Sequence, residues 1–199
     1  MNLYLLAALA AFFLFQLRTR EQRQRIALLA EQLRRYQIEP LMERLTEGYQ
    51  RALAESDPER RQSLWQQHGA SELALADQVG RLANDFARLD AAQTSVSRIP
   101  LPYATRWWPQ TSFDFRQLLA LHARGLAAAA SQESPRSPQD RAYTLLAEML
   151  LLQHSCHWFC RSRPVASARL LARHKTRHDQ VLQSVGAATR EGYAQIVGA

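Results

Sequence analysis

Ala142-Tyr-Thr-Leu-Leu-Ala-Glu-Met-Leu-Leu-Leu-Gln-His-Ser-Cys-His-Trp-Phe159 is the stretch that decides the fold. It contains no Gly or Pro, and a helix formed from it is apolar on almost every side. A helix without a wide polar face has to be surrounded by other helices. Glu148, Gln153 and His154 interrupt the segment too often for a membrane span. We therefore expect residues 142–159 to be the central helix of a bundle.

The composition of the whole chain indicates the same all-α class. The 199 residues are 47% hydrophobic, which is typical of a folded protein, and they include only 7 Gly. Ala, Leu, Gln, Arg and Glu dominate, and these residues favour helix, whereas β-branched residues are few. After an anchor and a stalk, about 160 residues remain, enough for one core. We expect a bundle of four to five helices.

Apolar residues at three- and four-residue steps predict helices on both sides of the central one. The expected helices cover residues 26–36, 41–53, 56–67, 71–89 and 113–130, and a last helix of about 30 residues begins at Pro164. Pro40 predicts a kink or a new start. Ser56 is the expected N-cap of its helix, with Glu59 completing a capping box. Residues 131–138 are expected to form an exposed linker.

The first 17 residues predict a membrane anchor. They carry no charged side chain, and as a helix they are about 26 Å long, slightly short of a hydrocarbon core of about 30 Å. A cleaved secretory signal is the alternative, but no Lys or Arg precedes the apolar run and large Phe residues follow its small ones. We therefore expect an uncleaved anchor at residues 1–17, a juxtamembrane amphipathic stalk at 18–55 and a cytoplasmic bundle at 56–199.

Charge predicts the orientation of this anchor. Arg18, Arg20, Arg23 and Arg25 follow the apolar run, with only Glu21 against them. Positively charged flanks stay in the cytoplasm, so a single pass through a bacterial-type inner membrane would place the N-terminus outside and the body inside. The same cations are expected to contact anionic lipid headgroups through residues 1–25. The narrow apolar stripe of the stalk, as in a coiled coil, predicts self-association or a protein partner.

A proline-rich connector at residues 96–111 carries an unusual apolar load. It includes Trp107 and Trp108 next to Arg106. One interpretation is a loop that folds back to cover the core. The other is an exposed aromatic patch for a partner or a second membrane contact, because Trp beside Arg suits the membrane interface.

A cluster of His and Cys near the end of the central helix is the one suggestive chemical pattern. His154, Cys156, His157 and Cys160 fall within seven residues, and His174 and His178 follow. One straight helix cannot supply four converging zinc ligands. If the last two helices are antiparallel, His174 lies near Leu151 or His154 and His178 near Glu148, so a metal or haem site that also uses Glu148 and His154 or His122 is an alternative. The simpler interpretation, which we prefer, is packed or hydrogen-bonded residues and no cofactor.

Cations also crowd the segment after the central helix. Arg161, Arg163, Arg169, Arg173, Lys175 and Arg177 occur with no acidic residue before Asp179. A solvated face is the simplest interpretation, and contact with anionic lipid or an acidic partner is the functional one. Nucleic acid binding is not expected, because no reading module is evident.

No catalytic motif is present, so we do not expect an enzyme. The sequence favours a binding or scaffolding protein at the inner membrane. A metal- or haem-binding bundle is the second hypothesis, and a basic module that contacts anionic lipid or nucleic acid is the third.

Overall fold

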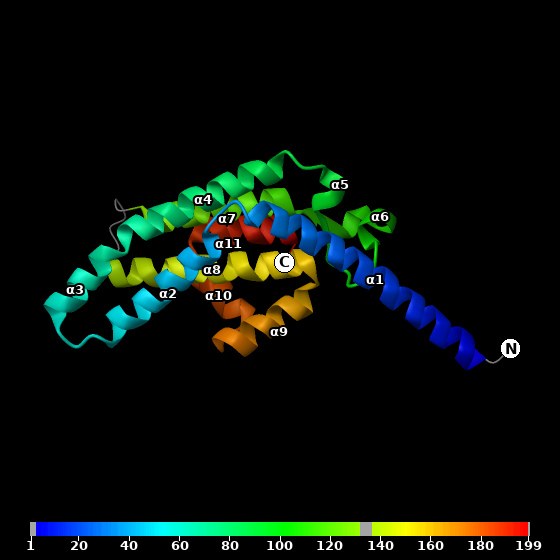
Figure 1. Ribbon diagram of the computed structural model, residues 1–199, viewed down its shortest axis with the longest axis horizontal. Helices are drawn as coiled ribbons and strands as arrows, with labels where there is room; N and C mark the ends of the chain where they lie inside the picture. The colour runs from blue at the N-terminus through cyan, green and yellow to red at the C-terminus, as the bar shows by residue number, and fades with distance from the viewer. Residues whose placement is uncertain (1–2, 132–136, 199) are drawn as a thin grey trace.

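The computed structural model describes residues 3–131 and 137–198, and almost all of them are helical (Figure 1). The elements are α1 (Leu3–Leu33), α2 (Ile38–Ala54), α3 (Pro58–Gln67), α4 (Gly69–Ala87), α5 (Ala91–Thr94), β1 (Ser95–Ser97), α6 (Ala104–Trp107), the 3-10 helix η1 (Pro109–Thr111), β2 (Ser112–Asp114), α7 (Phe115–Ala130), α8 (Pro138–Cys160), α9 (Arg163–His174), α10 (His178–Ser184) and α11 (Ala187–Val197). The predicted all-α bundle with a long apolar N-terminal helix is confirmed. The expected linker falls largely on residues 132–136, outside the described residues.

Helix α8 is the central helix, as its sequence predicts. It packs against α7, α9, α10, α1 and α2. Its buried residues, among them Leu145, Leu151, Trp158 and Phe159, lie on several sides of the helix. Phe159 stacks on Phe115 of α7 with ring centroids 4.5 Å apart, and Phe86 of α4 packs edge-on against both rings. These aromatic contacts hold α4, α7 and α8 together.

The segment 18–55 shares this core. Helix α1 is continuous for 31 residues, and its C-terminal part packs on α8 and α4, where Leu29 is buried. Helix α1 ends at Leu33, and α2 begins at Ile38 with Pro40 in its first turn. Leu41, Leu45 and other apolar residues of α2 are buried in the same core cluster as those of α8. The apolar stripe of the stalk is therefore covered mainly by this chain's own bundle.

The expected last helix is wrong, because three helices replace it. Helix α9 ends at Lys175, whose backbone is left-handed with φ +54°, and α11 begins after Gly186. Each break redirects the chain, so that α10 packs on α8 and α11 packs on α7. One straight helix could not reach both surfaces. Gly186 is a sequence signal for the second break, whereas Lys175 is an ordinary helix former and gives none.

The connector at residues 96–111 contains more structure than the sequence predicts. Strands β1 and β2 pair antiparallel, with Val96 opposite Phe113 and both side chains buried. Phe113 packs on Trp158 with ring centroids 5.0 Å apart, which anchors this small sheet on α8.

The N-cap of α3 is Asp57, and the prediction of Ser56 is wrong. The Asp57 carboxylate accepts hydrogen bonds from the N–H groups of Glu59 and Arg60, and the Ser56 side chain does not.

Candidate functional site

The first candidate site is the end of the bundle from which α1 leaves, which we call the exit face. It comprises residues 18–25 of α1, the segment 98–108 and the α8–α9 turn at residues 161–164. One groove at this end is lined by α1, by residues 96–102 and by residues 161–164, and Trp107 and Trp108 lie outside its lining. Figure 1 shows α6 at the end of the bundle from which α1 leaves. Three interactions fix these parts. The Tyr103 N–H donates to Glu21 Oε2 at 2.9 Å, Arg161 donates to the Gln22 side chain at 2.7 Å, and Arg25 donates to the Phe159 carbonyl at 3.2 Å.

The tryptophans of the connector are exposed on this face. The exposed fraction of the side chain is 70% for Trp107 and 45% for Trp108, and Leu101 is 48% exposed. The connector is nevertheless fixed in place, because Ala104 is buried and Trp158 donates a hydrogen bond to the Ser97 carbonyl at 3.3 Å. The two tryptophans therefore do not cover the core, and they form an exposed apolar patch on α6 and the residue after it.

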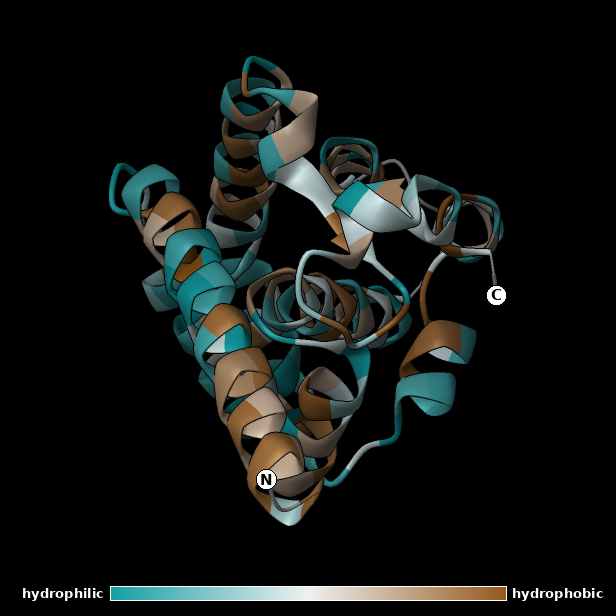
Figure 2. Cartoon of the chain, turned by 90° about the vertical axis from the view of Figure 1, so that its right-hand side faces the viewer, coloured by the Kyte–Doolittle hydropathy of each residue, from teal (hydrophilic) through white to brown (hydrophobic). Residues whose placement is uncertain are grey.

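The N-terminal half of α1 stands clear of the bundle. Its apolar side chains are exposed, and in Figure 2 the ribbon of the helix that starts at the N-terminus is mostly coloured as hydrophobic near that end. Of the described residues, only α1 is long and apolar enough to cross a membrane, and none of its apolar window is buried. A signal sequence has the same length and composition.

The four arginines that follow the apolar run have different surroundings. Arg20 and Arg23 are exposed, and Arg18 is half-buried. Arg25 is mostly buried. It forms an ion pair with Glu21 at 2.8 Å and lies over the Phe159 ring at 5.7 Å. Arg25 therefore holds α1 on the bundle, and the other three are the residues left to meet an external partner.

The His and Cys cluster is spread over different contacts. His154 bonds Ser167 of α9 at 3.0 Å, whereas Cys156 and Cys160 face a cavity against α1 and α2. His174, which the sequence places near Leu151 or His154, bonds Gln153 at 3.1 Å. Within the described residues no group of three or more His, Cys, Asp or Glu is arranged to hold a metal. The metal or haem hypothesis stays a prediction.

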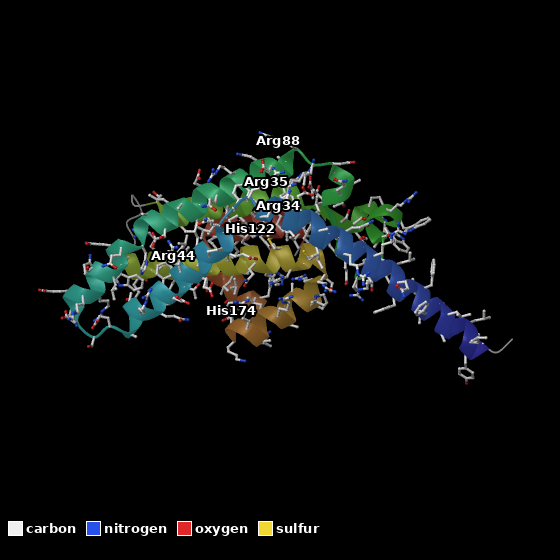
Figure 3. All side chains as sticks on the ribbon, in the orientation of Figure 1. Arg34, Arg35, Arg44, Arg88, His122 and His174 are labelled. Carbon is white, nitrogen blue, oxygen red and sulfur yellow. The ribbon has the colours of Figure 1, made fainter. Side chains whose placement is uncertain are left out.

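A buried polar network runs through the bundle in place of that site. His122 bonds Ser155 at 2.9 Å, and His178 bonds the Tyr193 hydroxyl at 3.1 Å. The rings of His154 and His178 lie 4.3 Å apart. Burial lowers the pKa of His122 to about 3; burial, with a contribution from His178, lowers the pKa of His154 to about 3. Figure 3 shows His122 inside the bundle and His174 on α9.

The expected pairing of His178 with Glu148 is wrong. Glu148 accepts a hydrogen bond from the Gly186 N–H at 3.0 Å and lies against Gly125 and Thr189. Burial raises its pKa, although the hydrogen bonds from Thr189 and Gly186 act in the opposite direction. The reason for the error is the break at Lys175, which turns α10 away from the register that one straight helix would have had.

The basic segment after α8 divides into engaged and unpaired cations. Arg163 lies over the Trp158 ring at 5.5 Å, and Arg177 pairs with Asp179 at 3.1 Å. Arg169 and Arg173 are exposed on α9 and make no ion pair with any described residue. These two are therefore the cations of α9 that a ligand can reach without breaking a charge pair.

Comparison with known proteins gives no relative. No protein-family model, curated protein or solved structure matches this chain. Its function is therefore argued from its own residues.

Sequence reasoning missed a second buried polar group at the other end of the bundle. The Tyr49 hydroxyl donates to Glu72 at 2.6 Å, and Arg141 lies 3.6 Å from the same carboxylate. Burial and this hydrogen bond raise the pKa of Tyr49. Tyr49 stands in the apolar stripe of α2, so its position gave no polar signal. A buried carboxylate with a hydrogen-bonded tyrosine and an arginine positions helices, and we assign it no chemistry.

Proposed function

We propose that this chain is a single-pass membrane protein that holds a helical bundle against the cytoplasmic surface of an inner membrane. One observation carries the proposal. The N-terminal half of α1 exposes apolar side chains around its whole circumference, and the exposed Trp107 and Trp108 follow shortly after Tyr103, whose N–H donates to Glu21 of α1. Both apolar surfaces are accounted for if one bilayer covers them.

The charges of the exit face support this arrangement. Residues 18–25 span about 10 Å of helix, which is enough to cross a headgroup layer of roughly 5–8 Å. Arg20 and Arg23 are exposed along this length, and Arg106 lies next to Trp107. Trp prefers the membrane interface, and each Arg near an anionic surface contributes roughly 1 kcal/mol. The excess of Arg after the apolar run favours a cytoplasmic body.

The bundle would then act as a binding or scaffolding component. Self-association through the stalk is restricted, because Leu29 is buried and Leu33 is half-buried in this chain's own bundle. Ile26, at 38% exposed, and the membrane helix are the parts of α1 left for a second copy. Crosslinking in native membranes followed by mass spectrometry tests this role, and a bundle that gives no reproducible crosslink contradicts it.

Quenching of tryptophan fluorescence by brominated lipids tests the membrane contact. In vesicles of brominated anionic lipid, the full chain should lose part of its emission through Trp107 and Trp108, because Trp65 and Trp158 are buried in the protein. The double variant W107A/W108A should lose this quenching. The matched control Tyr143→Ala removes an aromatic side chain that is 48% exposed elsewhere on α8 and should change nothing.

Two further results would contradict the proposal. The first is extraction of the full chain from membranes by alkaline carbonate, which releases peripheral proteins. The second is activity of a C-terminal reporter that works only outside the cytoplasm.

A further inference from the structure

Two adjoining cavities, both open to the surface, lie on either side of His157 of α8. The first, of about 300 Å³, is lined by α1, α2 and α8, with Leu82, Arg161 and Arg169 at its edges. The second, of about 320 Å³, lies between α8 and α9. Gln153, His157 and Arg169 line both cavities, so the two spaces meet at these three side chains.

The first cavity is apolar. Its lining includes Ile26, Leu33 and Met42, together with the thiols of Cys156 and Cys160. Burial raises the pKa of both thiols, that of Cys160 to about 11, so both are uncharged near neutral pH. Glu39 is the one carboxylate among the residues that line this cavity. Ligand sites of this kind are mainly apolar, with a few polar groups that orient the ligand.

The second cavity is cationic. Arg169, Arg173 and three histidines line it, and no carboxylate does. Burial lowers the pKa of His157, and the nearby Arg169 and Arg173 lower it further, as expected where positive charge is concentrated. Arg side chains bind carboxylate and phosphate through paired N–H groups. An anion placed here would have charged donors on α9 that pair with no described carboxylate.

We propose that the joined cavities bind an anionic amphiphile, with a single acyl chain in the apolar cavity and a carboxylate or phosphate headgroup in the cationic one. The ligand would lie across His157, its chain against α1, α2 and α8 and its headgroup between Arg169 and Arg173. Charge complementarity favours this occupant, because a purely apolar ligand would supply no anionic group for Arg169 and Arg173 to bind. The proposal does not depend on whether α1 crosses a membrane.

The two cysteines provide a native reporter, because they are the only ones in the chain and both line the apolar cavity. The full chain is placed in phosphatidylcholine nanodiscs, and the rate of maleimide addition to the thiols is followed by mass spectrometry. Lauroyl-lysophosphatidate and laurate should slow the reaction by roughly tenfold or more, since a bound chain covers the sulfur atoms. Lauroyl-lysophosphatidylcholine and inorganic phosphate at the same concentrations should not. Equal protection by the lysophosphatidylcholine, or by phosphate alone, overturns the proposal.

Two pairs of variants separate the headgroup from the chain. Arg169→Gln with Arg173→Gln should raise the lysophosphatidate concentration needed for protection by roughly tenfold or more, the value of one or two charged hydrogen bonds. Arg60→Gln with Arg88→Gln, which removes the same charge from exposed positions elsewhere, should not. Unchanged protection in the first pair refutes the headgroup site.

For the chain, Ala30→Trp fills the apolar cavity, and Ala27→Trp, an exposed position on the same helix outside the cavity, is its control. Native mass spectrometry should find bound lysophosphatidate on the control and not on Ala30→Trp. Retention by both variants overturns the proposal. The melting temperature of each variant is measured as well, and a value equal to that of the wild-type protein shows that the fold is intact. Carbonate extraction of the same samples reads membrane anchoring separately, so a failure here is distinguishable from a failure of the proposed function.

Discussion

Lowering the pH from 7.5 to 5.0 should destabilise the bundle through its buried histidines. His122 is fully buried, and its ring makes one hydrogen bond, to Ser155. Its pKa is about 3 in the folded protein, against the ordinary value of 6.5 that a histidine has in the unfolded chain. The unfolded state therefore binds the proton first, so stability falls as the pH drops below 6.5, and the loss is complete near pH 3.

The size of the effect follows from these two values. At pH 5.0 the unfolded imidazole is almost fully protonated and the folded one is neutral, which amounts to about 2 kcal/mol. His154, with the same pKa of about 3, adds a similar amount. The pair should therefore remove about 4 kcal/mol of the free energy of unfolding, a large part of the total for a domain of this size.

The assay is urea unfolding of the detergent-solubilised full chain, followed by circular dichroism, at pH 7.5 and 5.0. His122→Gln keeps a polar side chain and cannot titrate, so the difference in stability between the two pH values should shrink by about 2 kcal/mol. Burial acts to raise the pKa of Asp114, but the hydrogen bonds from the Arg116 side chain and backbone lower it on balance, so its contribution is lost only below about pH 4. Glu148, whose pKa burial raises, acts opposite to the histidines, but it does so in both proteins and cancels in the comparison. If His122→Gln shows the wild-type pH dependence, the reasoning is refuted.

Three further predictions concern the backbone and cofactors. Gly125→Ala should lower the free energy of unfolding in urea by about 1–3 kcal/mol, because the new Cβ would lie 2.4 Å from Thr189 Oγ1 and 2.5 Å from Glu148 Oε2. Gly80→Ala should instead stabilise α4 by about 0.5–1 kcal/mol, because its new Cβ would have no atom within 4 Å. Equal effects of the two substitutions would contradict this. Lys175→Gly should raise the melting temperature, since it relieves about 1 kcal/mol of left-handed strain, and a lower melting temperature would count against that. Elemental analysis and an absorbance spectrum should show no stoichiometric metal or haem, and a chelator should leave unfolding unchanged; a bound metal would revive the His and Cys hypothesis.

Local patterns in the sequence were enough to predict most of the helices. The apolar face of α4, from Leu75 to Phe86, is buried as its spacing predicts, and α8 is central because its sequence has no polar face to expose. The break at Lys175 was not predictable, since its residue favours helix and only the packing of α10 on α8 requires the turn. The pairing of β1 with β2 was missed for a similar reason. Val96 and Phe113 are far apart in sequence, and three-residue strands carry no readable alternation.

The sequence alone determined the apolar N-terminal helix, the all-α class and the cations available for anion binding. These are properties of composition and of periodicity along one helix, which are present before the chain folds. The tertiary structure decided which side chains meet. It separated His154 from Cys156, joined Tyr103 to Glu21 of α1, and joined Arg169 to the cavity that the two thiols line. Those juxtapositions depend on which face of a helix a side chain occupies and on the turns between helices, such as the α8–α9 turn that folds α9 back on α8.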